Sequence, residues 1–319
     1  MIPTYNCRHY LKQVVNSVLQ QDPGPNEMQI EVIDDCSTEN DPKAIIREIG
    51  QNRVSFYRQP HNVGISANWN TCIKRARGHW VHILHQDDIV LPEFYSRLGG
   101  ALRREMTIGA AFCRHIYMDE NGHWQSLSPL ERREPGILSN WLERIAVVQL
   151  IQTPSIVVRR SVYEKLGGFH VKMYYALDWE MWKRIAAHYP VWYEPQPLAC
   201  FRLHSSSATS RLIRSGADIC DMRRSIDFSK TYLPDAIAGE LTRKAREHYA
   251  LYALSTARRM LAMRDIAAAI AQIREAFKCS HSLRVTKSLV QLFVWAGIRW
   301  IWGKVRIGVL IPRQKGTRS

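Results

Sequence analysis

Apolar positions in the first 90 residues change their spacing several times, as alternating helices and strands do. Leu11, Val14 and Val18 recur at helical spacing, whereas Ile30-Glu31-Val32-Ile33 is a short apolar run that ends at a polar loop. The pattern predicts helices over residues 11–19, 42–49 and 65–76 and strands over 30–33, 54–57 and 80–84. Repeated strand–helix–strand units of this length predict an α/β fold with a mostly parallel sheet and helices on both faces.

Beyond Pro92 the pattern is more mixed and then becomes helical. It predicts helices over 93–104 and 178–187, the second with Asp178 as its N-cap, a hairpin turn at 119–122 and a strand at 155–158. One or two amphipathic helices are expected over 250–277. We therefore expect an α/β domain over 1–207, a helical extension over 208–284 and a basic, apolar segment over 285–319.

Nearly all of the net charge of +15 lies in the last third of the 319-residue chain. Residues 1–205 hold 23 Lys/Arg against 21 Asp/Glu, whereas residues 206–319 hold 21 against 8, and no acid follows Ser280. A nucleic-acid binder would need this charge on the sheet domain, so nucleic acid is not an expected partner. The seven cysteines form no CxxC pair and the N-terminus shows no signal-peptide pattern, which together favour a reduced, cytoplasmic protein.

The segment 289–311 is apolar and aromatic but carries Arg299, Lys304 and Arg306. Each central Arg or Lys costs about 2.5–3.5 kcal/mol on insertion scales, which argues against a membrane-spanning helix. An interfacial helix fits better, with its Trp and Phe side chains among lipid headgroups and its basic side chains facing anionic lipid. The alternatives are a helix packed on the protein's own body or, less in keeping with the clustered aromatic residues, a nucleic-acid-binding segment. We expect a peripheral protein on the cytoplasmic face of the cell membrane.

Two acidic pairs, Asp34-Asp35 and Asp87-Asp88, follow predicted strands. Ligand sites of open α/β sheets lie beyond the carboxyl ends of the strands, so both pairs are at the expected edge. Mg²⁺ or Mn²⁺ binds one or two carboxylates, with water and phosphate oxygens completing its shell. Adjacent acids in a loop are most often solvated or capping residues. These pairs therefore indicate a metal site only if the surrounding sequence motifs support it.

Four segments supply that context: Ile2-Pro3-Thr4-Tyr5-Asn6, Val32-Ile33-Asp34-Asp35-Cys36-Ser37-Thr38, Asn62-Val63-Gly64-Ile65-Ser66-Ala67-Asn68 and Leu84-His85-Gln86-Asp87-Asp88. In this order and spacing they resemble the family 2 glycosyltransferases, which have the GT-A fold. Leu166-Gly167-Gly168-Phe169, Asp178-Trp179-Glu180 and Phe201-Arg202-Leu203-His204-Ser205 extend the likeness to about residue 207.

The resemblance implies a metal-dependent enzyme that transfers a sugar from a nucleotide-diphosphate sugar to an acceptor hydroxyl and inverts the anomeric centre. It implies Mg²⁺ or Mn²⁺ as cofactor and a glycan or lipid-linked acceptor, as in bacterial surface-polysaccharide assembly. The residues it assigns to donor binding are Pro3, Thr4, Tyr5, Asp35, Gln86 and Arg202. Those it assigns to the metal are Asp87, Asp88 and His204, and those it assigns to catalysis are Asp178 as base, with Glu180 as the next candidate.

Two departures from the family pattern leave alternatives open. His85 stands where the family's metal motif has its first acid, and only Met1 and Ile2 precede Pro3, so either the true start lies upstream or the first strand is shortened. A catalytically impaired membrane-associated protein with the same fold is the main alternative. A metal-dependent nucleotidyltransferase is another, although residues 3–9 contain no glycine for a triphosphate loop.

Overall fold

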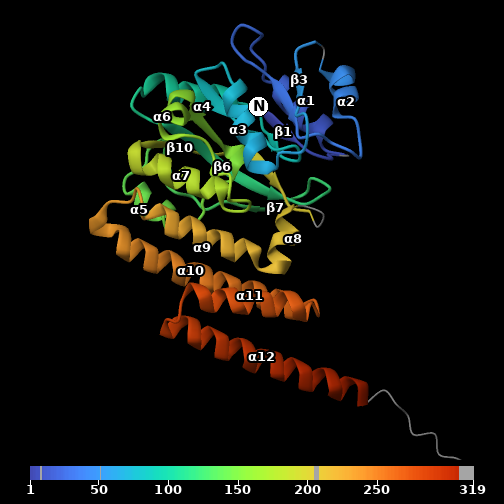
Figure 1. The fold of residues 1–319 in the computed structure, drawn as a ribbon, viewed down its shortest axis with the longest axis vertical. Coiled ribbons are helices and arrows are strands. Elements are labelled where there is room, and N and C mark those ends of the chain that lie inside the picture. The colour runs from blue at the N-terminus through green and yellow to red at the C-terminus, as the bar shows by residue number, and fades with distance from the viewer. Residues whose placement is uncertain (8, 51, 205–207, 309–319) are drawn as a thin grey trace, which may run out of the picture. The chain divides into compact units, whose positions relative to one another are not determined.

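The computed structural model describes residues 1–7, 9–50, 52–204 and 208–308 (Figure 1). The chain divides into two compact units: Met1–Arg211 with Asp221–Ala245, and Leu212–Cys220 with the chain from Arg246 onward. In this division residues 221–245 belong to the first unit, and the expected boundaries at 207 and 284 stay predictions.

A three-stranded parallel sheet begins the first unit. It has the order β1 (Ile2–Thr4), β2 (Glu31–Asp34) and β3 (Ser55–Arg58), and its register places Thr4 opposite Asp34. The connecting helices are α1 (Leu11–Leu19), α2 (Pro42–Ile49) and α3 (Ile65–Arg75). The shortened first strand therefore forms, and the backbone amide of Leu84 donates to the carbonyl of Met1 at 3.0 Å. This bond places the chain after β4 (Trp80–His82) beside β1.

The second sheet is mixed rather than mostly parallel. Its main path runs β4, β9 (Ile156–Arg159), β6 (Ala110–Met118), β10 (Val191–Arg202) and β5 (Ile89–Val90), with β7 (Trp124–Leu127) on β6 and β8 (Gly136–Ile137) on β10. Among the described strands of this sheet, β6 and β10 pair in parallel and the other pairs are antiparallel. The prediction of parallel pairing is thus right for β1–β3 and wrong for this sheet, because hairpins such as β6–β7 replace crossover helices.

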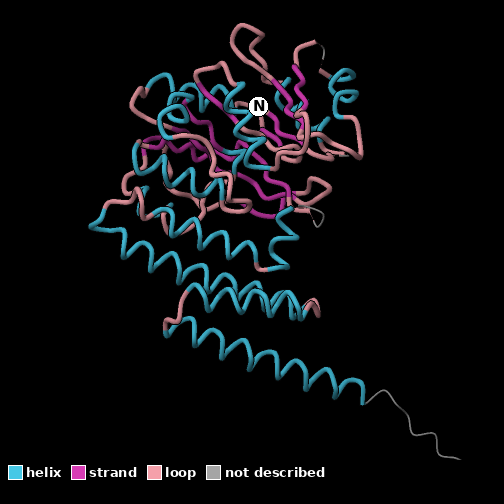
Figure 2. The backbone as a smooth tube through the Cα atoms, in the orientation of Figure 1, coloured by secondary structure: helices cyan, strands magenta, loops and turns pink. Residues whose placement is uncertain are grey.

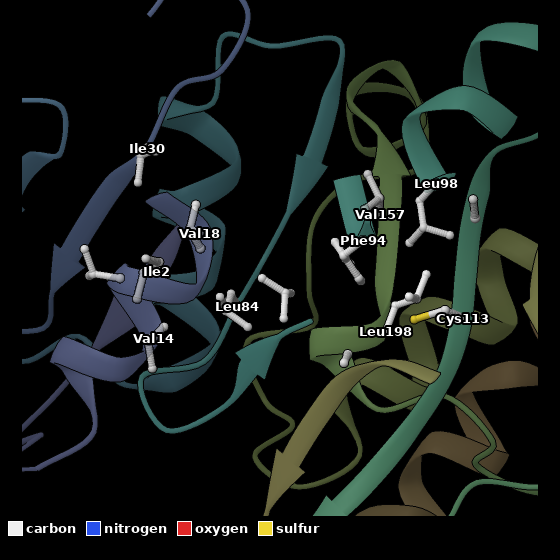
Figure 3. Close-up of a cluster of buried hydrophobic side chains, with 14 of the residues drawn as sticks. Ile2, Val14, Val18, Ile30, Leu84, Phe94, Leu98, Cys113, Val157 and Leu198 are labelled. Atoms are coloured by element: carbon white, nitrogen blue, oxygen red, sulfur yellow. The ribbon is translucent and has the colours of Figure 1, made fainter. Parts of the chain in front are cut away.

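The sheets are covered by α4 (Phe94–Arg104), α5 (Trp141–Ile145), α6 (Arg160–Leu166) and α7 (Leu177–His188), with the short 3-10 turn η1 (Thr153–Ser155) before β9. One apolar cluster joins both sheets. Figure 3 shows Ile2, Val14 and Leu84 on one side of this cluster and Phe94 and Leu198 on the other, all of them at most 5% exposed. This shared core fixes the loops that follow β1, β2 and β4.

The remaining helices are α8 (Ala208–Ser215), α9 (Ala217–Ser229), α10 (Asp235–Ala262), α11 (Ile266–Cys279) and α12 (Leu283–Gly308). Figure 2 shows every strand in the first unit, while the described part of the second unit consists of helices and loops. Within the second unit, Gln272 donates to Asp218 at 2.8 Å and joins α11 to the start of α9. Among the described residues, no helix combines the length and apolar character that crossing a membrane requires.

Candidate active site

The Gln86 side chain ties the loop after β4 to the end of β1. Its Oε1 accepts hydrogen bonds from Thr4 Oγ1 at 2.8 Å and from the Tyr5 amide at 2.7 Å. Pro3 and Thr4 are buried, whereas Tyr5 is 42% exposed. The structure therefore brings these predicted donor-binding residues together, while their role in binding the donor stays a prediction. The Thr4 hydroxyl, however, donates to the Gln86 side-chain oxygen Oε1 within the protein.

Asp87 and His204 meet at the centre of the site. His204 donates from Nε2 to Asp87 Oδ2 at 2.9 Å, and this hydrogen bond is the main cause of its raised pKa. The Arg202 guanidinium donates from Nε to the Asp87 carbonyl at 2.8 Å. The end of β10 thus holds the loop after β4 from its other side.

Asp88 is fully buried behind Asp87. Its Oδ1 accepts from the Arg202 amide at 2.8 Å and its Oδ2 lies 3.2 Å from His85 Nδ1. Burial raises the pKa of Asp88 to about 6. The possible ligand atoms of His85, Asp87 and Asp88 all lie within 4.8 Å of one another.

His85 is held by an aromatic stack. Its ring lies 4.6 Å from that of Trp69, which in turn contacts Phe169 edge-on at 5.0 Å. Burial opposes a charge on this ring, but the hydrogen bond to Asp88 and the charges of Asp88 and Asp87 outweigh it and raise the His85 pKa. The residue that departs from the family's acidic motif is therefore built into the acidic cluster.

Asp35 joins two of the sequence motifs. Its carboxylate accepts from the Val63 and Gly64 amides at 2.8 and 3.0 Å, and Gly64 has a φ of +84°, which favours glycine. Burial is the main cause of its raised pKa. Asp34, to which no role was assigned, is buried and paired with Arg58 at 2.7 Å.

Asp178 lies in the first turn of α7 rather than at its N-cap, which is Ala176. Its Oδ2 accepts from Gln149 Nε2 at 3.0 Å and Thr153 Oγ1 at 3.3 Å, and its Oδ1 accepts from the Trp179 amide at 2.6 Å. Burial raises the pKa of Asp178 to about 6, with the Trp179 amide and the charge of His85 acting in the opposite direction.

Glu180 is separated from this cluster. Its side chain is fully buried and pairs through both oxygens with Arg184 at 2.9 and 2.8 Å. Arg184 also donates to the carbonyls of Leu166 and Gly168, so this ion pair connects α7 to the chain after α6. These contacts of Glu180 are structural, and its place as second catalytic candidate stays a prediction.

Arg202 makes its hydrogen bonds within the protein, and its role as a donor-binding residue stays a prediction. Besides Asp87, its guanidinium donates to Gln13 Oε1 at 2.9 Å and to the Glu120 carbonyl at 3.2 Å. It lies 4.2 Å above the Tyr10 ring, and the residue is 4% exposed. Its contacts are those of a residue that holds β10, α1 and the β6–β7 hairpin together.

Sequence reasoning missed three residues near Asp178. Gln149 and Thr153 donate to its carboxylate, and Asp221 accepts hydrogen bonds from the amides of residues 174–176, just before α7. The first two lie in a short, irregular segment with no periodic signal, and Asp221 belongs to the helical region beyond the recognised motifs. A polar side chain on a buried helix face was the only available signal for Asp221.

Comparisons with known proteins agree with this arrangement. The family model described as "Glycosyl transferase family 2" matches residues 1–167, more than half of the chain. The chain belongs to glycosyltransferase family 2. It is similar to an uncharacterised protein of Mycobacterium tuberculosis, with 25% identity over 234 residues, which are 70% of this chain and 72% of that protein.

A chondroitin synthase of Escherichia coli is 29% identical over 124 residues, 38% of this chain but 18% of the synthase. Other relatives are also matched over less than two thirds of their length, such as a Mycoplasma genitalium glycosyltransferase at 31%. Among solved structures, a mannosyltransferase of Pyrobaculum calidifontis superposes with a TM-score of 0.59 at 17% identity, covering 95% of this chain and 86% of that one. S. aureus TarS superposes with a TM-score of 0.56 at 14% identity, covering 86% and 88%. The predicted GT-A fold and glycosyltransferase class are confirmed.

Proposed function

We propose that this family 2 glycosyltransferase moves a sugar from a nucleotide-diphosphate sugar to an acceptor hydroxyl by single displacement with inversion, using Asp178 as base. The observation that carries the proposal is the Asp178 carboxylate, which is oriented by three donors and has a pKa of about 6. A carboxylate of this pKa is ionised at neutral pH and more basic than an exposed Asp, as a general base needs to be.

The donor is proposed from the motifs and from similar structures. TarS was solved with UDP and UDP-GlcNAc, and the Pyrobaculum mannosyltransferase with GDP-Man and Mn²⁺. In this chain Thr4, Tyr5 and Asp35 lie at the carboxyl ends of β1 and β2. A nucleotide placed there would lie between the two acidic loops.

The residues present fit a divalent cation. Asp87 offers a carboxylate beside the His204 imidazole, and both ligand types suit Mn²⁺, whereas Mg²⁺ prefers oxygen ligands. Asp88, held by the Arg202 amide, supports the loop from behind. When bound, such an ion would neutralise charge on the departing diphosphate.

In the proposed reaction, Asp178 takes the proton of the acceptor hydroxyl while that oxygen attacks the anomeric carbon. A carboxylate offers about four lone-pair positions, and three are used by Gln149, Thr153 and the Trp179 amide. These contacts fix the orientation of the carboxylate and leave capacity for one more proton. Their hydrogen bonds also stabilise the charged form that burial disfavours.

Asp178→Asn tests the proposal. We expect kcat for sugar transfer to fall about 10²- to 10⁴-fold, the usual contribution of a general base. Stabilisation against heat by UDP or GDP with Mn²⁺ should persist, and Asp87→Ala should remove it. Near-full transfer by folded Asp178→Asn would show that Asp178 is not the base. A screen of nucleotide sugars would identify the donor.

We further propose that α12 lies on an anionic membrane surface and that the acceptor is a lipid-linked glycan. Val290, Phe293, Val294 and Ile298 are each more than half exposed and recur at helical spacing, on a face away from buried Leu292. The charge of the surrounding sequence is complementary to anionic lipid, since the chain after Ser280 has eight Lys/Arg and no acid.

Vesicle sedimentation tests the membrane proposal. The full chain should bind vesicles containing phosphatidylglycerol more tightly than phosphatidylcholine vesicles, and Phe293→Ser with Val294→Ser should weaken that binding. Ile266→Ser is the matched control, because Ile266 is an exposed apolar residue of α11 (61%) outside this face. Equal binding by both variants would contradict the proposal.

A further inference from the structure

A carboxylate outside the family motifs closes the start of α7. Asp221 Oδ2, on α9, accepts hydrogen bonds from three consecutive backbone amides: Tyr174 at 2.9 Å, Tyr175 at 2.8 Å and Ala176 at 2.9 Å. Asp221 is 4% exposed, and Arg224 lies 3.9 Å from its other oxygen. All of these residues belong to the first compact unit.

The contact holds the turn that leads into α7. The amides at the start of an α-helix have no partner within the helix, and Ala176, the N-cap of α7, has no side-chain oxygen to offer them. Successive amides turned toward one point make an anion site, and a carboxylate accepts from them more strongly than a neutral oxygen does. Of these amides Asp221 binds the one of the N-cap residue Ala176, together with the amides of Tyr174 and Tyr175 before it, so a different segment of the chain holds the turn that leads into α7.

We infer that Asp221 is a positioning residue for Asp178, which is the second residue of α7. This inference rests on the proposed role of Asp178 as base. Asp221 fixes the backbone from which the Asp178 side chain extends, while Gln149 and Thr153 fix its carboxylate. A helix that follows the recognised motifs thereby becomes part of the catalytic apparatus.

Other contacts, from α9 and from the segment that follows it, also hold α7 and make Asp221 separable from the fold. Lys183 Nζ, buried in α7, donates to the Ser225 carbonyl at 2.9 Å, and Tyr232 Oη donates to the Glu180 carbonyl at 3.3 Å. Both contacts lie farther along α7 and involve main-chain acceptors that a change at Asp221 leaves in place. Loss of the Asp221 charge should thus increase the mobility of residues 174–178, while the packing of α9 against α7 is affected less.

The experiment compares Asp221→Asn and Asp221→Ala with Asp178→Asn in the full chain. The matched control is Asp227→Asn, on the same helix, where Asp227 pairs with Lys230 at 3.1 Å at the surface. Rates are taken per folded molecule, below the melting temperature of every variant. We expect both Asp221 variants to lower kcat about 10- to 100-fold, since small misplacements of a reacting group have effects of this size. The donor KM should stay within about twofold, and Asp227→Asn should behave as wild type.

A purely structural role would lower the melting temperature without changing how kcat depends on pH. Positioning predicts that the acidic limb of the kcat profile moves to lower pH in Asp221→Asn, because a loosened Asp178 becomes more hydrated. Wild-type kcat and an unmoved limb in both Asp221 variants, with Asp178→Asn inactive, would overturn the inference alone. An active Asp178→Asn would instead overturn the proposed base.

Discussion

His204 donates to Asp87 across 2.9 Å, although 117 positions separate the two residues in the chain. The bond joins the loop after β10 to the loop after β4, and both side chains are partly exposed, at 13% and 22%. A carboxylate and an imidazole at this separation can share a proton or a divalent cation. The contact is thus the structural reason to treat the end of the recognised family region as part of the candidate metal site.

His204→Ala should weaken Mn²⁺ binding about 10-fold or more, a loss typical of removing a ligand or its partner. The affinity of the unmodified protein should also fall as the pH falls, because the raised pKa of His204 keeps its proton bound to higher pH. Electron paramagnetic resonance of free Mn²⁺ in the presence of UDP or GDP measures both effects. His123→Ala, a change on the exposed β6–β7 hairpin, is the control. Equal Mn²⁺ binding by both variants would remove His204 from the site.

The rate of transfer should depend on the ionisation of Asp178. Because burial raises its pKa to about 6, the base is mostly ionised at pH 7.5 and mostly protonated at pH 5. We expect kcat to rise with pH, with half-maximal activity near pH 6, and to fall about tenfold per unit well below that value. Assays at saturating donor, acceptor and Mn²⁺ measure this limb. A flat profile between pH 5 and 8 would contradict the assignment.

Glu180→Gln should affect stability rather than chemistry. The change leaves Arg184, 14% exposed, without its charged partner, and breaking a buried ion pair typically costs about 3–5 kcal/mol of unfolding free energy. The kcat per folded molecule should remain within a few-fold of wild type. Urea unfolding and transfer assays separate the two effects.

Glu164→Gln is the matched control for Glu180→Gln. Glu164 pairs with Arg160 at the same helical spacing but is 55% exposed, so its loss should cost less than about 1 kcal/mol. If Glu180→Gln were stable but inactive, the result would support Glu180 as a catalytic candidate.

The repeated spacing of apolar residues predicted most helices and strands of the first 90 residues. Helix α2 begins at Pro42 and ends at Ile49, as the sequence indicates, because Asp41 caps it and Pro42 suits its first turn. Pairing direction in the second sheet was not predictable in the same way. Parallel and antiparallel strands have the same alternation of side chains, and only long-range contacts distinguish them.

The site was predicted in part for a similar reason. Motifs located the segments that carry Asp35, Asp87, Asp178 and His204, and the structure brings Asp87 to His204. Motifs did not reveal which side chains face inward. Glu180 and Arg202 belong to recognised segments, yet their polar groups bind other parts of the protein. Asp221 lies in a helix whose sequence carries no motif, and only the folded chain brings it to the start of α7.

Arg202→Lys should destabilise the fold by about 2–4 kcal/mol of unfolding free energy. The guanidinium donates in separate directions to Asp87, Gln13 and Glu120, and a lysine ammonium on a flexible chain cannot reach all three acceptors. Urea unfolding measures the loss, with Arg47→Lys on the exposed side of α2 as the control. If Arg202 instead acted mainly on the donor diphosphate, its change would raise the donor KM and leave stability intact. We expect the opposite result: a large loss of stability, with little change in the donor KM of the folded fraction.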